Sequence, residues 1–232
     1  MAATVQSTKP SPSVLPKPSS SRPRRASTKA ASPKGSSDER AQRRHNRLPQ
    51  LLDEAAKVFA QRGFAGASVR EIVQPIGMLP GSMYYHFPTK EDLLVAVYRE
   101  GVDRISHKVD MAIDAFAEPW ARLEAACVAH LTAVLDSTDY SQVVVRIRPT
   151  DAPPVHDALL ALRDSYESRF AALIAALPLP RAVVRRDLRL FLLGGLNYAQ
   201  AWYREDGALG PADIARRFIR LLKTDLAAEE TL

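Results

Sequence analysis

The chain has 232 residues, of which 46% are hydrophobic and 25% are charged, so it is long enough to bury a sizeable core. No apolar run approaches the ~18 residues of a membrane-spanning helix, and the single cysteine, Cys127, excludes a disulfide framework, which fits a reducing cytoplasm. The net charge of +6 is uneven, because residues 1–47 hold 11 Lys/Arg against 2 acidic residues, whereas the remainder holds 21 against 24.

Residues 1–36 consist mainly of Ser, Pro, Lys, Arg and Ala and contain no acidic residue. Such a composition offers little to offset the entropy of ordering the chain, and it predicts a disordered basic tail. The tail lacks the apolar segment of a secretory signal. Two interpretations stay open: the tail contacts DNA phosphates without sequence preference, or it only keeps the protein in solution.

The next segment predicts an amphipathic helix. Ser36 with Glu39 offers a capping box that would start this helix near Ser37. Pro49 would then lie in the helix interior, where a proline costs about 3 kcal/mol. The regular helix therefore either begins at about Leu48 or kinks at Pro49. The apolar face of this helix is formed by Leu48, Leu51, Leu52, Ala55 and Phe59.

A short helix is predicted after it. Ser68 and Glu71 are spaced as a second capping box, which starts the helix at Val69. Gly77 is suited to ending it. Pro75 should shorten or bend the helix before that point.

A further short helix is predicted at residues 80–87, because Pro80 suits a first helical turn. Pro88 stops it, and Thr89 with Asp92 caps the helix that follows. Two short helices joined by a glycine-containing turn, the second rich in aromatic hydrogen-bonding residues, are typical of a helix-turn-helix.

Residues 48–94, about a fifth of the chain, resemble the DNA-binding domain of the TetR family of bacterial transcription regulators. The resemblance is carried by A-x-x-x-F-A-x-x-G-F from Ala55, by S-V-R-E-I from Ser68, and by G-S-M-Y-Y-H-F from Gly81 with P-T-K-E-D-L-L after it. The chain departs from many members at Leu79-Pro80, where a serine and a phosphate-contacting lysine are usual. The run L-P-G-S-x-Y-Y-H-F is similar to a subset that includes repressors of fatty-acid and sterol breakdown.

This resemblance implies an all-α protein with a helix-turn-helix domain at residues 37–92 and a helical ligand-binding and dimerisation domain at residues 93–232. The expected function is that of a cytoplasmic, sequence-specific transcriptional regulator. By the family's default it is a repressor, released from its operator by a small molecule.

The helix at residues 80–87 is expected to enter the major groove of double-stranded operator DNA, which is ~12 Å wide. Met83 and Phe87, four residues apart, are expected to face the protein core. Tyr84 suits a phosphate and Tyr85 a base or a thymine methyl, although one of the two tyrosines alternatively packs inward. The full set of expected DNA contacts is Arg44, Arg47, Ser68, Arg70, Gly81, Ser82, Tyr84, Tyr85, His86 and Lys90.

The remainder of the chain shows helical periodicity and no strand alternation. Pro119 opens one of its helices, and the prolines of residues 146–154 indicate a loop. The expected helical segments are 90–117, 120–135, 155–177, 182–205 and 211–227, and residues 140–147 form a short apolar piece between the second and third of them.

The last two of these helices have wide apolar faces, and Gly194-Gly195 lies within the first. Two interpretations stay open at the level of periodicity: the faces close the domain's own core, or they pair two copies of the chain. The resemblance favours a homodimer.

The resemblance also implies a small-molecule effector. G-G-L-N-Y-A-Q-A-W-Y from Gly194, with G-x-L-G-P-A-D-I after it, is similar to the closing helices of members that respond to acyl-CoA. We expect an acyl-CoA or another amphipathic carboxylate first, and a hydrophobic drug-like compound second. Guanidinium groups would hold an anionic head group. Candidate ligand-binding residues are Met111, Trp120, Arg146, Arg148, Tyr166, Phe170, Asn197 and Trp202.

The sequence contains no catalytic fingerprint, and its five histidines are scattered singly, so we expect neither an enzyme nor a metal or cofactor site. Two alternatives remain: a ligand-independent DNA binder that acts through the basic tail, and a helical interaction module.

Overall fold

The computed structural model describes the backbone of residues 47–228 and the side chains of residues 47–223, and this part of the chain is helical without a strand. The basic tail, Arg44 and the alternative helix start near Ser37 lie outside it. The α-helices are α2 Leu48–Gly66, α3 Val69–Val73, α4 Pro80–His86, α5 Lys90–Asp114, α6 Pro119–Val134, α7 Asp139–Arg146, α8 His156–Ala175, α9 Arg185–Tyr198 and α10 Pro211–Ala228. Short 3₁₀ helices occupy Pro149–Asp151, Pro153–Val155 and Ala199–Ala201.

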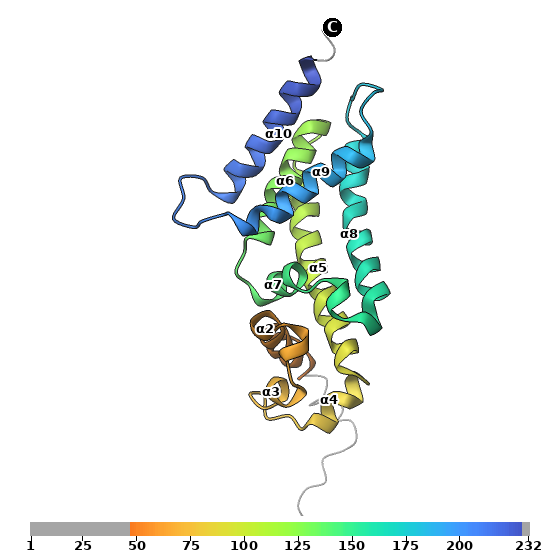
Figure 1. Ribbon diagram of the computed structural model, residues 1–232, viewed down its shortest axis with the longest axis vertical. Helices are drawn as coiled ribbons and strands as arrows, with labels where there is room; N and C mark the ends of the chain where they lie inside the picture. Colours follow the sequence, from red (N-terminus) through yellow and green to blue (C-terminus); the bar gives the residue numbers. More distant parts are fainter. Residues whose placement is uncertain (1–46, 229–232) are drawn as a thin grey trace, which may run out of the picture.

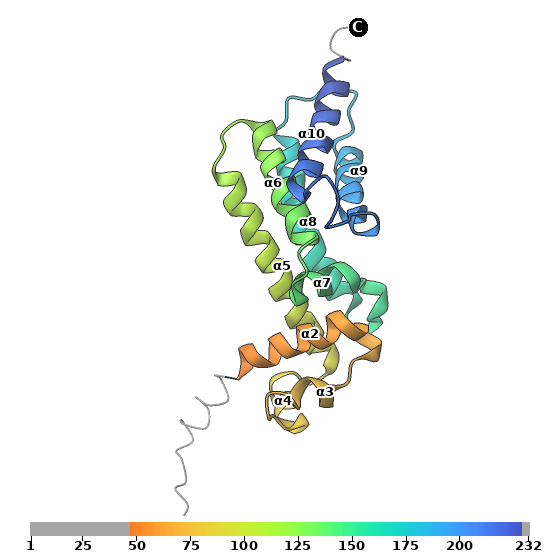
Figure 2. The same cartoon turned by 90° about the vertical axis from the view of Figure 1, so that its left-hand side faces the viewer.

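The molecule is elongated, with α2, α3 and α4 at one end and α10 at the other (Figure 1). The long helix α5 runs from the small unit into the bundle formed by α6, α8, α9 and α10 (Figure 2). Helix α7 lies between α2 and this bundle in both views. The helix-turn-helix is therefore joined to the bundle by one continuous helix and one short one.

Local sequence signals set most of the helix starts in the small unit. Pro49 lies in the first turn of α2, so this helix begins at Leu48 rather than kinking at the proline. At the start of α3 the Glu71 N–H donates to Ser68 Oγ at 3.3 Å, and the Ser68 N–H donates to Glu71 Oε2 at 3.2 Å, which confirms the capping box. α3 then ends at Val73, as expected ahead of Pro75.

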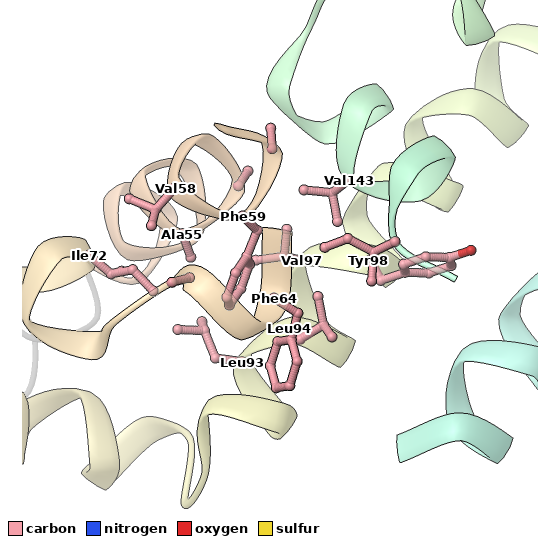
Figure 3. Close-up of a cluster of buried hydrophobic side chains, with 14 of the residues drawn as sticks. Ala55, Val58, Phe59, Phe64, Ile72, Leu93, Leu94, Val97, Tyr98 and Val143 are labelled. Carbon is pink, nitrogen blue, oxygen red and sulfur yellow. The ribbon is translucent and has the colours of Figure 1, made fainter. Parts of the chain in front are cut away.

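One hydrophobic cluster joins the small unit to the bundle. Phe59 and Phe64 of α2 pack with Ile72 of α3 and with Leu93, Leu94 and Val97 of α5 (Figure 3). Val143 of α7 and Tyr98 belong to the same cluster. The packing is thus continuous across residues 92 and 93, the expected boundary between the two domains.

The end of α9 differs from the expectation. A helix was predicted over residues 182–205, but α9 stops at Tyr198 and is followed by a 3₁₀ turn. Arg204 donates from Nε and Nη2 to the two carboxylate oxygens of Asp206, at 3.1 and 3.0 Å, and the Gly207 N–H donates to the Arg204 carbonyl at 3.0 Å. The 3₁₀ turn at Ala199–Ala201 and this second turn take the place of the last part of the expected helix.

The paired glycines of α9 have different roles. A Cβ on Gly195 would lie 3.1 Å from Phe218 Cε2, so Gly195 allows α10 to approach α9 within the same chain. A Cβ on Gly194 would meet no atom within 4 Å, and Gly194 lies on the exposed side of the helix. One face of α9 therefore packs on α10 of the same chain, and the face that carries Gly194 is left exposed.

Candidate nucleic-acid interface and ligand cavity

Helix α4 is anchored by one side chain and presents the others outward. Met83 is fully buried and Phe87 is half-buried against the same cluster, as the sequence predicts. Tyr85 is 74% exposed and Tyr84 48% exposed. The expected alternative, in which one tyrosine packs inward, is not seen.

The remaining α4 residues also suit close approach by a partner. Gly81 is exposed, and a Cβ there would face open space, so internal packing does not require a glycine. Ser82 is half-buried on the adjacent face. The His86 ring lies edge-on to Tyr85 with centroids 5.4 Å apart, which positions these two rings together at the end of the helix. The exposed surface of α4 thus combines small residues at its start with aromatic hydrogen-bonding groups at its end.

Three further candidates lie on the helices that flank α4. Arg47 is exposed directly before α2, and Arg70 is exposed on α3. The Ser68 hydroxyl is occupied locally, because it donates to Glu71 Oε2 at 2.9 Å and accepts from the Glu71 N–H. These hydrogen bonds hold the pKa of Glu71 below its usual value, so this carboxylate stays charged at the start of α3.

The Lys90 ammonium, which the sequence suggests as a phosphate contact, has partners within the protein. The Lys90 ammonium donates to the carbonyl oxygens of Phe64 and Ala67 at 2.9 and 3.0 Å. It also lies 4.3 Å from the centre of the Phe64 ring. α2 loses regular helical geometry at Gly63, whose φ is 68°, and exposes carbonyls at its end. Lys90 satisfies two of these carbonyls and so ties the start of α5 to the end of α2.

A cavity of about 210 Å³ opens within the bundle, walled by α5, α6, α7, α8 and α9. Three of the expected ligand residues line it: Arg148, Tyr166 and Asn197. Phe170 lies one layer behind, with its ring 5.7 Å from that of Tyr166. Arg146 lines an adjoining surface hollow that shares Val134, Val145, Asn197 and Gln200 with the cavity.

Three other candidates lie away from the cavity. Met111 is 65% exposed near the far end of α5. Trp120 packs against a second hydrophobic cluster, which is formed by buried residues of the bundle such as Leu131, Phe170 and Leu192, and the Lys223 ammonium lies 5.4 Å from its ring. Trp202 is half exposed after the end of α9. Aromatic and Met residues suit apolar ligands, but Met111 on α5, Trp120 at the start of α6 and Trp202 beyond the end of α9 do not line the cavity.

His130 is a cavity residue that the sequence analysis did not select. It is 3% exposed, and its ring nitrogens contact the Tyr166 hydroxyl at 2.7 Å and Asn197 Oδ1 at 3.1 Å. An amide oxygen only accepts, so Nε2 carries the proton and Nδ1 accepts from Tyr166. Burial lowers the pKa of His130 to about 4, and the Asn197 hydrogen bond opposes this only in part. A neutral histidine thus links α6, α8 and α9 beneath the cavity.

Charged groups also line the same cavity. Arg148 and Arg163 both line it, each near a carboxylate: Arg148 Nη2 is 3.2 Å from Asp151, and Arg163 Nη2 is 3.6 Å from Glu167. The sequence does not mark Arg163 as a ligand-binding candidate, because it is one arginine among many on helical segments. The cavity is therefore lined by the buried His130 with its partners Tyr166 and Asn197, and by two guanidinium groups.

The described side chains offer no arrangement typical of catalysis or metal binding. No group of three or more His, Cys, Asp and Glu residues among them is placed to hold a metal ion. Cys127 is fully buried, and burial raises the pKa of its thiol, which keeps it unreactive. Within the described part of the chain, the helices are too short or too polar to cross a membrane.

Family models match both halves of the chain. The model described as "Bacterial regulatory proteins, tetR family" matches residues 51–97, and the model described as "Tetracyclin repressor-like, C-terminal domain" matches residues 117–226. The first match covers the helix-turn-helix and the start of α5. The second covers α6 to α9 and most of α10, and so all walls of the cavity except α5.

Individual proteins agree with these models. The HTH-type transcriptional repressor KstR2 of Mycobacterium tuberculosis is 33% identical over 101 residues, 44% of this chain and 50% of that protein. The chain therefore spans about half the length of this relative. KstR2 of Rhodococcus jostii is 25% identical over 190 residues, covering 78% of this chain and 92% of the relative.

Solved structures share the fold. AibR in complex with isovaleryl coenzyme A and operator DNA has a TM-score of 0.65 at 22% identity, covering 75% of this chain and 97% of that one. The fatty acid degradation regulator FadR from Bacillus halodurans has a TM-score of 0.65 at 18% identity, covering 75% and 93%.

Proposed function

This chain belongs to the TetR family of bacterial regulatory proteins, and we propose that it is a cytoplasmic transcriptional repressor rather than an enzyme. It binds operator DNA as a homodimer and leaves the operator when an acyl-CoA-like ligand occupies the cavity. The observation that carries the DNA-binding part is the geometry of α4, in which a buried Met83 fixes a helix whose tyrosines face outward.

The proposed reading surface is built on α4. Tyr85 contacts a base or a thymine methyl, and Tyr84 contacts the sugar-phosphate backbone. Gly81 and Ser82 let the start of the helix approach the DNA closely. Flanking contacts come from Arg44, Arg47, Ser68, Arg70 and His86, whereas Lys90 positions the helices instead of contacting phosphate.

We place the dimer interface on the outer face of α9, with a contribution from α10. Phe191 is 72% exposed, and Tyr198 and Leu221 are each 69% exposed. Leu190 and Gly194 lie on the same side of α9. Apolar side chains of this size are seldom left together in water, and a second copy would cover them. Pairing also supplies the second helix-turn-helix that a two-half-site operator requires.

The ligand proposal follows from the size and charge of the cavity. A volume of about 210 Å³ holds roughly seven water-sized groups, which suits a short acyl chain rather than a whole coenzyme. The acyl chain of the ligand would lie against Tyr166 above His130. The amide nitrogen of Asn197 would remain available to the acyl carbonyl. The phosphates of the coenzyme would meet Arg148 and Arg163, with Arg146 in the adjoining hollow. AibR, which shares the fold, is known in complex with isovaleryl coenzyme A and operator DNA.

Fluorescence anisotropy with DNA from upstream of the protein's own gene tests this function. The expected result is sequence-dependent binding that falls on addition of isovaleryl-CoA and falls less with longer acyl-CoAs. Binding unaffected by any acyl-CoA would reject the ligand but retain the regulator. Binding that tracks only the salt concentration, without sequence preference, would instead favour a DNA binder that acts through its basic tail.

A further inference from the structure

Leu79, the residue directly before α4, is a large apolar side chain that is 74% exposed. Among the described residues of the small unit formed by α2, α3 and α4, the large hydrophobic side chains that are exposed are Leu79, Tyr84 and Tyr85. All three belong to α4 or to the residue that precedes it, and α4 lies at the end of the molecule away from the bundle (Figures 1 and 2). The two tyrosines are part of the proposed reading surface, and Leu79 adjoins that surface at the start of the helix.

The backbone of the turn between α3 and α4 fixes the position of Leu79. Gly77 takes a φ of 61°, which reverses the chain after α3. The Met78 N–H then donates to the Val73 carbonyl at 3.0 Å, and the Met78 side chain is buried in the hydrophobic cluster of the small unit. On the other side, the Leu79 carbonyl accepts from the Ser82 N–H at 2.9 Å. Leu79 is therefore held between a buried residue and the first turn of α4.

A leucine at this position stabilises neither the helix nor the core. Leu79 is the N-cap residue of α4, and its side chain makes no capping hydrogen bond. A serine, threonine, aspartate or asparagine would supply an oxygen for the free N–H groups of the first turn. Exposed leucines are common on protein surfaces, but this one stands at the start of the helix that we propose enters the major groove. Its partner is therefore to be sought on the DNA.

The chemistry of the major groove restricts that partner. In a helix-turn-helix, the residues at the start of the second helix reach the base edges. The edges present hydrogen-bond donors and acceptors and one apolar group, the C5 methyl of thymine. An isobutyl side chain makes no hydrogen bond, and beside a phosphate it would displace water from the charge without replacing the lost hydrogen bonds. The thymine methyl is thus the group that fits Leu79.

We propose that Leu79 recognises a thymine in each half-site of the operator through apolar contact with its C5 methyl group. This inference rests on the proposed function and adds a specificity-determining residue to it. Leu79 and Tyr85 are six positions apart, about 9 Å along a helix, so the two residues contact different base pairs. Leu79 sets the preference at the base pair that faces the start of α4.

The test removes the methyl groups from the DNA and the leucine from the protein. The upstream DNA fragment is amplified with dUTP in place of dTTP, which exchanges every thymine methyl for hydrogen and keeps the base pairing. For each protein, fluorescence anisotropy gives the dissociation constant for the uracil fragment divided by that for the thymine fragment. One buried methyl group corresponds to about a fourfold change in affinity, so two half-sites contribute about 15-fold. We expect the ratio to be about 15-fold smaller for Leu79→Ala than for the wild type.

Two further variants separate contact with the methyl group from other effects. Leu160→Ala is the matched control, because Leu160 is also an exposed leucine but lies on α8, and its ratio should equal that of the wild type. Leu79→Ser supplies a capping oxygen, so it should be at least as stable as the wild type in urea and should show the same small ratio as Leu79→Ala.

A wild-type ratio in both Leu79 variants would overturn the proposal. It would do so even if the variants bound both fragments more weakly, because equal weakening would mean that Leu79 only positions α4. A wild-type protein that binds the upstream fragment without sequence preference would reject the proposed function and this inference with it.

Discussion

Replacing Lys90 with methionine separates two roles for this residue. Lys90→Met keeps the length and apolar stem of the side chain but removes the ammonium that donates to the Phe64 and Ala67 carbonyls at 2.9 and 3.0 Å. If Lys90 positions the helices, the variant should lose stability. If Lys90 contacts phosphate, the variant should lose a charge-dependent part of DNA affinity.

Three terms set the expected loss of stability. Each hydrogen bond from a charged donor contributes about 1.5–3 kcal/mol when buried, but Lys90 is only partly buried and water can reach the freed carbonyls, so the lower end applies. The contact with the Phe64 ring adds about 0.5–1 kcal/mol. Against these, a cation at the start of α5 opposes the helix dipole by about 0.3–1 kcal/mol. The two hydrogen bonds together with the ring contact, less the dipole term, give an expected net loss of about 3 kcal/mol.

Urea unfolding measures this loss, and anisotropy over a range of salt concentrations measures the DNA term. Loss of a phosphate contact in each protomer would reduce the salt slope of log K by about 1.8 in a dimer, because each contact contributes about 0.9. The positioning role predicts a lower unfolding free energy with an unchanged slope. Arg70→Met, on the exposed surface of α3, serves as the control and should show the opposite pattern. A Lys90→Met protein of wild-type stability with a reduced slope would refute the positioning role.

Four further predictions test other parts of the molecule. Tyr85→Ala should abolish sequence-specific binding in anisotropy while changing the unfolding free energy by less than about 0.5 kcal/mol, since Tyr85 is 74% exposed. Gly81→Ala should stabilise α4 by up to about 1 kcal/mol because its Cβ faces open space, and yet weaken operator binding; equal affinity would show that DNA does not approach there. In the unfolded chain His130 is protonated below its ordinary pKa of 6.5, whereas in the folded protein it is protonated only near pH 4. The unfolding free energy should therefore fall by up to about 3 kcal/mol as the pH is lowered from 6.5 to 4. Urea titrations of His130→Gln should lack this pH-dependent component. Phe191→Glu should yield monomers in analytical ultracentrifugation, and a stable dimer would move the interface away from α9.

Signals that depend on neighbouring residues were predictable from the sequence. The capping boxes at Ser68 and Thr89 fixed the starts of α3 and α5, and Pro119 marked the start of α6. Met83 could be assigned to the core because its spacing from Phe87 matches one helical turn. The family resemblance supplied the arrangement that connects these elements.

Features that depend on residues far apart in the chain could not be predicted. The role of Lys90 depends on carbonyls 26 and 23 residues earlier, which become available because α2 ends irregularly at Gly63. His130 contacts residues 36 and 67 positions later, so its sequence signal was only a polar residue on an apolar helix face. Met111 and Trp202 were chosen by residue type, but helix rotation and the turn after α9 leave them outside the cavity.

DNase I footprinting of the region upstream of the protein's own gene tests the central claim most directly. The account predicts one protected stretch with two inverted half-sites, present with the wild-type protein, absent with Tyr85→Ala and lost from the wild type on addition of the effector. Protection spread without sequence preference, and unchanged in Tyr85→Ala, would contradict the claim that α4 reads an operator.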